Sequence, residues 1–289
     1  MIEHINATDW DAESAVATVA LLTMLGLVEQ QRRVFLSYRR SDSAHMATQL
    51  HTELVRNRFD VFLDRFALLP GEDFQRKLDE DLADKAFVVL LESPDLRDSP
   101  WVQHEITYAL SHRIDILAIT LPRVTKAQLV PAIDEAFRVR LEDGDCTTGG
   151  QLTSETLRSV LQRIELAHAR ALRRRREQMV GSLRDQLERD GCNCVPVEDW
   201  TILATGHGRI PGVFLVTPRR PRPEDLYAVH VVRRRMANRV NRGDLFGAVV
   251  HEVEHLADEQ RSLLIWICDS ANLRMRRLRE CALGEETAA

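Results

Sequence analysis

Short hydrophobic runs alternate with helical periodicities through the first half of the chain. Four runs have the length and composition of β-strands: Val34–Tyr38, Phe59–Leu63, Ala86–Leu91 and Ile114–Leu121. Apolar positions three or four residues apart predict helices between them, near 46–55, 74–82 and 102–111. Unbroken apolar runs such as 86–91 are typical of parallel strands that are covered on both faces. This alternation predicts a doubly wound parallel α/β sheet.

The second half of the chain has a weaker pattern. Residues 142–154 have the composition of a linker, and a highly charged helix is expected over 155–190. Strands are expected at 193–197, 213–216, 227–232 and 263–268, with helices between and after them. The predicted organisation is an N-terminal helical extension (1–32), a first domain (33–141), a linker with a charged helix (142–190), and a second, smaller α/β domain (191–289).

Composition and charge agree with two soluble domains. Hydrophobic residues make up 44% of the chain and charged residues 29%, as in ordinary globular proteins. The net charge of −5 gives no general argument for nucleic-acid binding. Residues 1–150 hold 16 basic and 25 acidic residues, whereas 151–289 hold 23 and 19, which supports a boundary near 150. The five cysteines form no disulfide framework, so we expect a reducing cytoplasm.

An apolar stretch near the start, Ala15–Val28, bears on membrane association. It is only 14 residues long and follows an acidic segment, whereas a helix that spans a bilayer needs about 20 apolar residues. We therefore expect a helix that packs on the first domain and is capped by Thr8 or Asp9. Association with a membrane is the alternative.

Three motifs follow the first strands in order. Val34–Asp42 reads VFLSYRRSD; Val61–Arg65 reads VFLDR and is followed by LPGEDF at 69–74; Ser99–Glu105 reads SPWVQHE. Together they resemble the first box, the second box with its BB loop, and the W-x-x-x-E element of Toll/interleukin-1 receptor (TIR) domains. The resemblance covers about 110 residues and implies a flavodoxin-like fold for them. A third box is poor, with Phe137 where an aromatic pair is expected, which leaves the last strand–helix unit in doubt.

The resemblance implies an activity, because TIR domains with a glutamate in W-x-x-x-E cleave NAD+. Glu105 is then the catalytic residue. Trp101 would wall the pocket, Arg39 and Arg40 would meet the pyrophosphate, and Phe62 would lie beside the same edge. Loss of nicotinamide passes through an oxocarbenium-like ribosyl cation, which one carboxylate can stabilise. No cofactor is implied, since NAD+ is the substrate.

The family also implies a setting. Bacterial fusions of a TIR domain to another module resemble antiphage immune effectors that deplete NAD+ or make a cyclic signal. The active site of such enzymes commonly forms where the BB loop of one subunit meets a neighbouring subunit, so we expect self-association through TIR domains. An activating ligand or protein partner is expected at the C-terminal domain. Two alternatives stay open: Glu105 is a plain surface residue, or the domain is a non-enzymatic scaffold.

A separate motif, His251-Glu252-Val253-Glu254-His255, matches the H-E-x-x-H pattern of zinc metalloproteases. On a helix, both histidines would share one face. The charged Glu254 and the missing third ligand argue against this site, although Asp258 and Glu259 are candidates. The other interpretation is an acidic amphipathic helix that buries Leu245, Val249, Val253 and Leu256. We expect no stoichiometric zinc.

Overall fold

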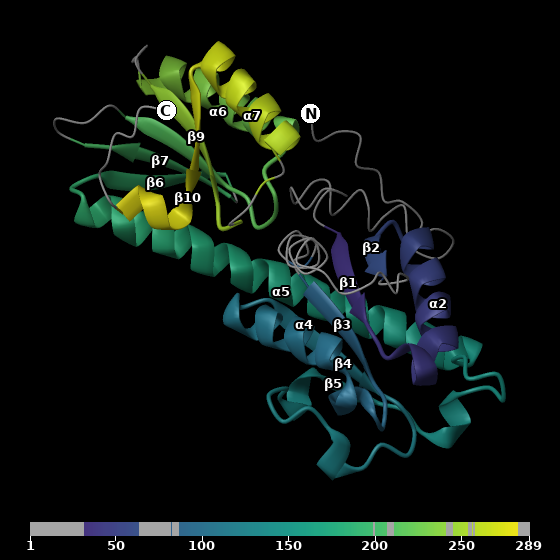
Figure 1. The fold of residues 1–289 in the computed structure, drawn as a ribbon. Coiled ribbons are helices and arrows are strands. Elements are labelled where there is room, and N and C mark those ends of the chain that lie inside the picture. Colours follow the sequence, from purple (N-terminus) through teal and green to yellow (C-terminus); the bar gives the residue numbers. More distant parts are fainter. Residues whose placement is uncertain are drawn as a thin grey trace, which may run out of the picture. The chain divides into compact units, whose positions relative to one another are not determined.

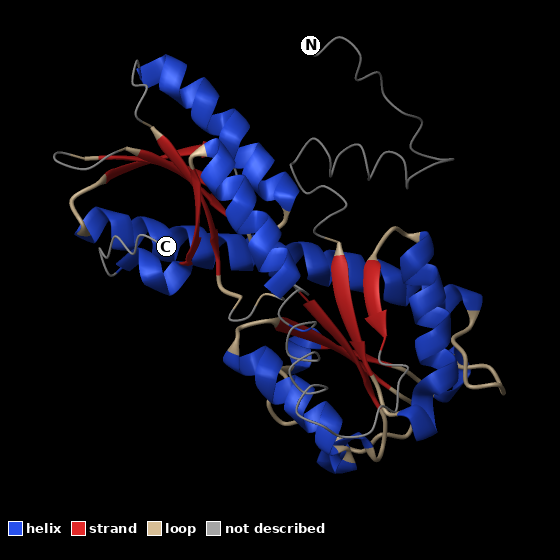
Figure 2. Ribbon diagram, turned by 45° about the horizontal axis from the view of Figure 1, so that its top comes forward, coloured by secondary structure: helices blue, strands red, loops and turns tan. Residues whose placement is uncertain are grey.

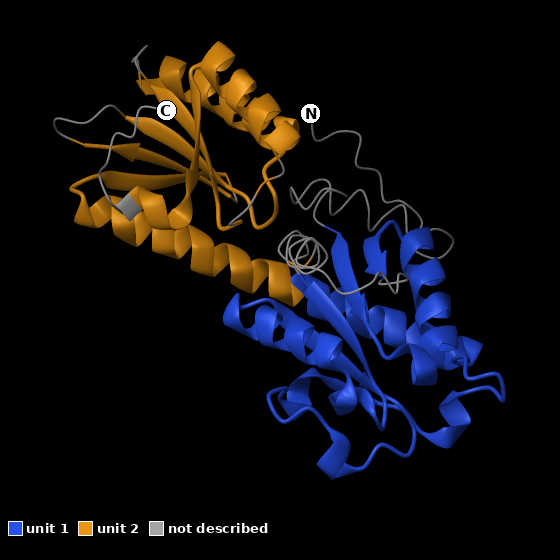
Figure 3. Ribbon diagram, viewed as in Figure 1, with its two compact units in different colours: residues 1–70, 85–169 blue, residues 71–84, 170–289 orange. Residues whose placement is uncertain are grey.

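In the computed structural model of the chain, two compact units divide inside one long helix (Figure 3). The structure describes residues 32–63, 82, 87–198, 200–206, 211–240, 245–253, 256 and 258–282. Among the described residues, all those before residue 170 except Leu82 belong to the first unit, and the second unit begins at residue 170. The expected N-terminal helix at 15–28 and the BB loop at 64–74 lie outside the described residues, as does the expected helix at 74–82 except for Leu82.

The first unit is built on a five-stranded parallel sheet in the order β2-β1-β3-β4-β5 (Figure 1). Its strands are β1 (Arg33–Ser37), β2 (Asp60–Leu63), β3 (Phe87–Glu92), β4 (Asp115–Thr120) and β5 (Arg138–Arg140). Every pairing between neighbouring strands is parallel. β1 and β3 are buried along their full length, which explains the unbroken apolar runs 34–36 and 87–91 within them. The doubly wound α/β fold is therefore confirmed.

Helices α2 (Arg40–Arg56) and α4 (Pro100–Ser111) flank this sheet (Figure 2). The chain moves from β1 to β2 in one direction and from β3 to β4 in the other. Because parallel crossovers are right-handed, α2 and α4 fall on opposite faces. The strand order reverses between β1 and β3, and ligands of such sheets bind outside the carboxyl ends of the strands at this point.

The last strand of this sheet is the one that the sequence left in doubt. β5 has three residues and follows Phe137 directly. The connecting segments contain short 3-10 helices: η2 (Leu96–Asp98), η3 (Lys126–Gln128), η4 (Glu135–Phe137) and η5 (Asp143–Asp145). A strand this short carries too little periodicity to be read from sequence, and it is identified by its pairing with β4.

Helix α5 (Ser154–Arg189) contributes to both units. In the first unit it buries Val160 and Ile164, and His168 packs edge-on against the rings of Phe59 and Phe87. In the second unit it supplies the buried residues Met179, Leu183 and Leu187 to a core. The segment 142–190, expected as a linker with a charged helix, thus contains residues of two hydrophobic cores.

The second unit has a mixed five-stranded sheet in the order β10-β9-β8-β7-β6. Its elements are β6 (Asn193–Glu198), β7 (Thr201–Thr205), β8 (Gly212–Val216), α6 (Pro223–Val240), β9 (Phe246–His251), α7 (Asp258–Ala271), β10 (Leu273–Arg277) and η6 (Leu278–Ala282). β6, β7 and β8 pair antiparallel, whereas β8, β9 and β10 pair parallel. One core packs against α5 and another against α6 and α7. A second α/β domain is confirmed.

Three sequence expectations in this unit are wrong. Residues 227–232 and 263–268 are helical, in α6 and α7, rather than strands. Conversely, the amphipathic helix expected through Leu245 and Val249 is replaced by strand β9. Short apolar runs do not distinguish a strand from a buried helix face, and here the core contacts decide. In α6 the buried residues Leu226, Val229, Val232 and Met236 recur three or four apart.

Candidate functional site

The edge formed by the carboxyl ends of β1 and β3 carries buried polar side chains. Ser37 ends β1, and Glu92 and Ser93 end and follow β3; all three are buried. Buried polar groups need hydrogen-bond partners, and each of these has one on a neighbouring element. Polar side chains therefore gather where the fold predicts a ligand site.

Helix α4 delivers Glu105 to this edge. The helix begins as the sequence indicates, with Pro100 in its first turn and Ser99 as the N-cap, whose hydroxyl accepts a hydrogen bond from the amide of Val102. Glu105 lies in the second turn and is only 4% exposed. The hydroxyl of Ser37 donates a hydrogen bond to Oε2 of Glu105. This contact joins two elements that are 68 residues apart in sequence.

The burial of Glu105 contradicts the alternative that it is a plain surface residue. The sequence also did not single out Ser37. A polar residue that closes a buried apolar strand was the available signal, because the carboxyl ends of parallel strands are where ligands bind. A buried carboxylate that is held by a hydroxyl from the neighbouring strand is a group with a fixed orientation, as a catalytic carboxylate requires.

The other expected site residues occupy more open positions. Trp101, one turn before Glu105, is 39% exposed. Arg40 is exposed at the first position of α2. Phe62 is half-buried in β2 and stacks on Phe35, with ring centroids 5.0 Å apart. Its ring thus packs on the sheet, and a role of these residues toward a substrate stays a prediction.

Arg39 belongs to a small charged cluster beyond β1 and β3. Its Nη1 lies 3.3 Å from Oδ2 of Asp42 and 3.1 Å from Oδ2 of Asp95. Ser93 also donates to Asp42, at 2.8 Å. Burial raises the pKa of Asp42, but hydrogen bonds from Ser41 and Ser93 and the charge of Arg39 together hold that pKa below its ordinary value. To bind a pyrophosphate, Arg39 would have to exchange one of these carboxylates for it.

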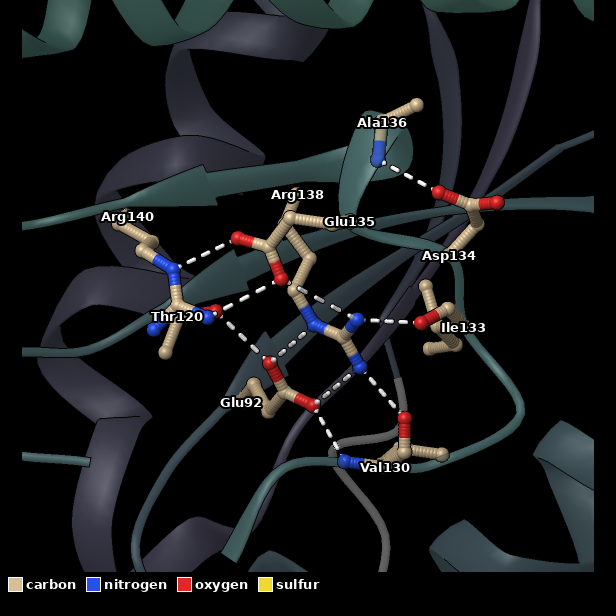
Figure 4. A network of polar contacts seen from close by, with 9 residues as sticks. All are labelled: Glu92, Thr120, Val130, Ile133, Asp134, Glu135, Ala136, Arg138 and Arg140. Carbon is tan, nitrogen blue, oxygen red and sulfur yellow. Dashed lines mark hydrogen bonds and ion pairs between the residues drawn. The ribbon is translucent and has the colours of Figure 1, made fainter. Parts of the chain in front are cut away.

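A second polar network ties β3, β4 and β5 together (Figure 4). The Glu92 side chain is fully buried, and its carboxylate faces the guanidinium of Arg138, with Nε to Oε2 at 3.3 Å. Thr120 donates to Glu92 Oε2 at 2.7 Å and the amide of Val130 donates to Oε1 at 2.7 Å. Arg138 donates in turn to the backbone carbonyls of Ile133 and Val130. The network fixes the short strand β5 and the loop before it.

The H-E-x-x-H motif does not form the helical site that its spacing suggests. His251 is the last residue of β9, and His255 lies outside the described residues. Glu252 pairs with Arg175, at 2.6 Å, rather than facing a metal site. Among the described residues, no three His, Cys, Asp or Glu side chains are grouped to hold a metal ion. The metalloprotease interpretation loses its geometric basis, and the absence of zinc stays a prediction.

Buried His251 leads instead to a prediction on pH. Burial and the charge of Arg277 lower the pKa of His251 from 6.5 to about 4. The unfolded chain therefore takes up this proton first, so stability is complete above pH 6.5 and is lost as the pH falls toward 4. The full loss is on the order of 3 kcal/mol. Denaturant unfolding of wild type and His251→Leu across this range measures it, because the variant lacks this contribution.

The matched control for this experiment is His230→Leu, since His230 is more exposed and lies on α6 of the same unit. Burial and the charges of Arg233 and Arg234 lower the pKa of His230 as well, but this side chain is only half-buried, so we expect the control to remove a smaller part of the pH dependence than His251→Leu does. An equal slope in wild type and His251→Leu would contradict the prediction.

Comparison with known proteins identifies relatives of the first unit. Residues 34–160 match the TIR domain family. A 2′ cyclic ADP-D-ribose synthase, BtTIR, from Bacteroides thetaiotaomicron is 23% identical over 104 residues, which are 35% of this chain and 36% of that protein. This chain thus matches about a third of the length of that relative.

A solved structure, the TIR domains of the activated Roq1 resistosome that directly recognises the pathogen effector XopQ, is also similar. It is 20% identical, with a TM-score of 0.28, over 31% of this chain and 57% of that chain. The family match reaches from the second residue of β1 into the first turns of α5. With the three motifs on a parallel sheet of order 2-1-3-4-5, residues 34–160 of this chain are a TIR domain.

Proposed function

We propose that the TIR domain cleaves the bond between nicotinamide and ribose in NAD+, with Glu105 as the catalytic carboxylate. The observation that carries the proposal is the buried Glu105 side chain, held by Ser37 at the carboxyl edge of the sheet. Similarity to a TIR protein named as a cyclic ADP-ribose synthase supports the same chemistry. NAD+ is the substrate, so the reaction needs no further cofactor.

The proposed reaction requires from the protein mainly one negative charge that is held close to the ribose. The bond between ribose C1′ and the nicotinamide nitrogen breaks, and its electron pair neutralises the pyridinium as nicotinamide leaves. Positive charge develops on the ribose, where a preorganised carboxylate lowers the barrier. Water then adds to C1′ with release of a proton, or a nucleophile within the same molecule closes a ring. The position of Ser37 against Oε2 supports a fixed orientation for Glu105 during this step.

The proposal is tested by incubating the full chain with NAD+ at high protein concentration and separating the products. We expect nicotinamide together with either ADP-ribose or a cyclic isomer, and the ratio of these two identifies hydrolase or cyclase activity. Folded protein that releases no nicotinamide at any concentration would favour a scaffold that acts only through TIR contacts. In that case the hydrogen bond between Ser37 and Glu105 serves only to hold α4 against β1.

We further propose that the TIR domains assemble to become active, and we expect specific activity to rise with protein concentration. The physical reason is that a site completed by a neighbouring subunit follows the population of assembled chains. Nicotinamide release and molecular mass are measured on the same dilution series. Full specific activity in samples that stay monomeric during turnover would contradict this.

An enzyme that consumes NAD+ on assembly would suit an antiphage immune effector in the cytoplasm, with the second unit receiving a ligand or protein signal. No helix within the described residues is long and apolar enough to cross a membrane. Among the described residues all five cysteines are free.

A further inference from the structure

The second unit exposes apolar side chains on one surface, the outer face of α6 and α7. We define this outer face by Tyr227 and Val231 on α6 and by Leu263, Ile265 and Trp266 on α7. They are half of the large, exposed hydrophobic side chains among the described residues, and Tyr227 and Trp266 are the two most exposed, at 71% and 66%. Tyrosine and tryptophan are the residues that most often dominate binding energy at interfaces.

The helical periodicity explains why these residues are not part of the core. On α6 the buried residues Leu226, Val229, Val232 and Met236 face the sheet, and Tyr227 and Val231, four residues apart, lie on the opposite side. On α7 the buried residues are Leu264 and Cys268, which leaves Trp266 outside. The two helices lie side by side over the sheet (Figures 1 and 2). The outer face therefore includes residues of both helices.

The charges around this face are arranged in two opposite groups. β8, β9 and β10 are parallel, so α6 and α7 run in the same direction and begin at the same end. The exposed charged side chains at the starting end of the two helices are three acidic and one basic: Glu224, Asp258, Glu259 and Arg261. The exposed charged side chains at the finishing end are three basic and one acidic: Arg234, Arg235, Arg239 and Asp269. Of these, Arg235 already pairs with Glu198 of its own chain.

We propose that the outer face of α6 and α7 is a two-fold interface with a second copy of this chain. A two-fold axis that lies in the plane of the interface, perpendicular to the helices, sets the helices of one copy antiparallel to those of the other. The acidic end of each copy then meets the basic end of its partner, and the apolar residues meet at the centre. Such self-complementarity is the property that an isologous two-fold interface requires. An anionic membrane or an acidic peptide would match only one end.

The test is the mass of the full chain by analytical ultracentrifugation over a wide range of concentration. We expect a monomer–dimer equilibrium that Trp266→Ser and Tyr227→Ser weaken by about tenfold or more each. Val195→Ser is the matched control, because Val195 is 47% exposed on β6 of the same unit but lies outside the outer face. The control should leave the equilibrium unchanged. Thermal melting confirms that each variant is folded, and the readout does not depend on NAD+ cleavage.

Charge-reversal variants test whether the partner that binds the outer face is a second copy of this chain. Changing the basic end alone, with Arg234→Glu and Arg239→Glu, brings like charges together and should weaken the dimer; Glu224→Arg with Glu259→Arg should do the same. Making all four changes restores opposite charges and should restore the dimer. A wild type that stays monomeric overturns the proposal, and so does a dimer that is insensitive to Trp266→Ser. Failure of the fourfold variant to recover would overturn the antiparallel arrangement in which the acidic end of one copy meets the basic end of the other.

Discussion

Replacing Glu105 by glutamine is expected to lower nicotinamide release from NAD+ by about 100- to 1000-fold, the usual effect of losing one preorganised electrostatic group. Glutamine keeps the shape of the side chain and can still accept the hydrogen bond from Ser37. It removes the negative charge that the proposed mechanism places against the ribosyl cation. Initial rates at saturating NAD+ measure the effect, with thermal melting of the same samples.

Because Glu105 is buried, the choice of substitution decides whether a loss of activity can be separated from a loss of stability. An exposed glutamate would cost little to remove, but Glu105 is buried and bonded. Glu105→Ala leaves the Ser37 hydroxyl without this partner, which is expected to destabilise the unit by about 1–3 kcal/mol. Glu105→Gln separates chemistry from folding, and Glu155→Gln, at the exposed first turn of α5, is its matched control. Full activity in folded Glu105→Gln would show that another group performs the reaction.

Truncation of Arg138 is expected to destabilise the first unit by about 3–5 kcal/mol, because it leaves the fully buried Glu92 carboxylate without its counter-charge. The matched control is Arg123→Ala. Arg123 makes a bidentate contact with Asp143, but both side chains are well exposed. Exposed pairs contribute little, so this control should change stability by less than about 1 kcal/mol. Denaturant unfolding of Arg138→Ala and Arg123→Ala measures both.

Arg138→Ala could unfold the domain, so a milder variant tests the same network. Thr120→Val removes only the hydroxyl that donates to Glu92, and a loss of about 1–3 kcal/mol is expected. Equal, small effects of Arg138→Ala and Arg123→Ala would show that the buried network adds nothing beyond a surface ion pair.

Much of the first unit follows from local sequence. The strands β1 to β4 are apolar runs, and α2 and α4 have helical periodicity, so each element carries its own signal. Ser99 and Pro100 mark the start of α4 because their chemistry suits an N-cap and a first turn wherever they occur. Glu105 could be named because it ends a short motif on a single helix.

Contacts between distant residues could not be obtained in this way. Ser37 matters because β1 and α4 bring it to Glu105, and Glu92 because β5 brings Arg138 to it. Local sequence carries no information on contacts between distant residues. In addition, β5 is too short to show the alternation of apolar and polar residues that marks a strand. The network in Figure 4 was therefore invisible in the sequence, although each of its residues is plainly charged or polar.

In the second unit, too, local sequence predicted some elements and contacts between distant residues decided others. The sequence by itself determined that the region folds as α/β and that β6 and β8 are strands. Only the tertiary structure decided that 227–232 and 263–268 are helical and that His251 ends a strand. The physical reason is that a short apolar segment gains similar burial as a strand or as one face of a helix. Which form it takes depends on the surface it packs against, and that surface is made by residues far away in the chain.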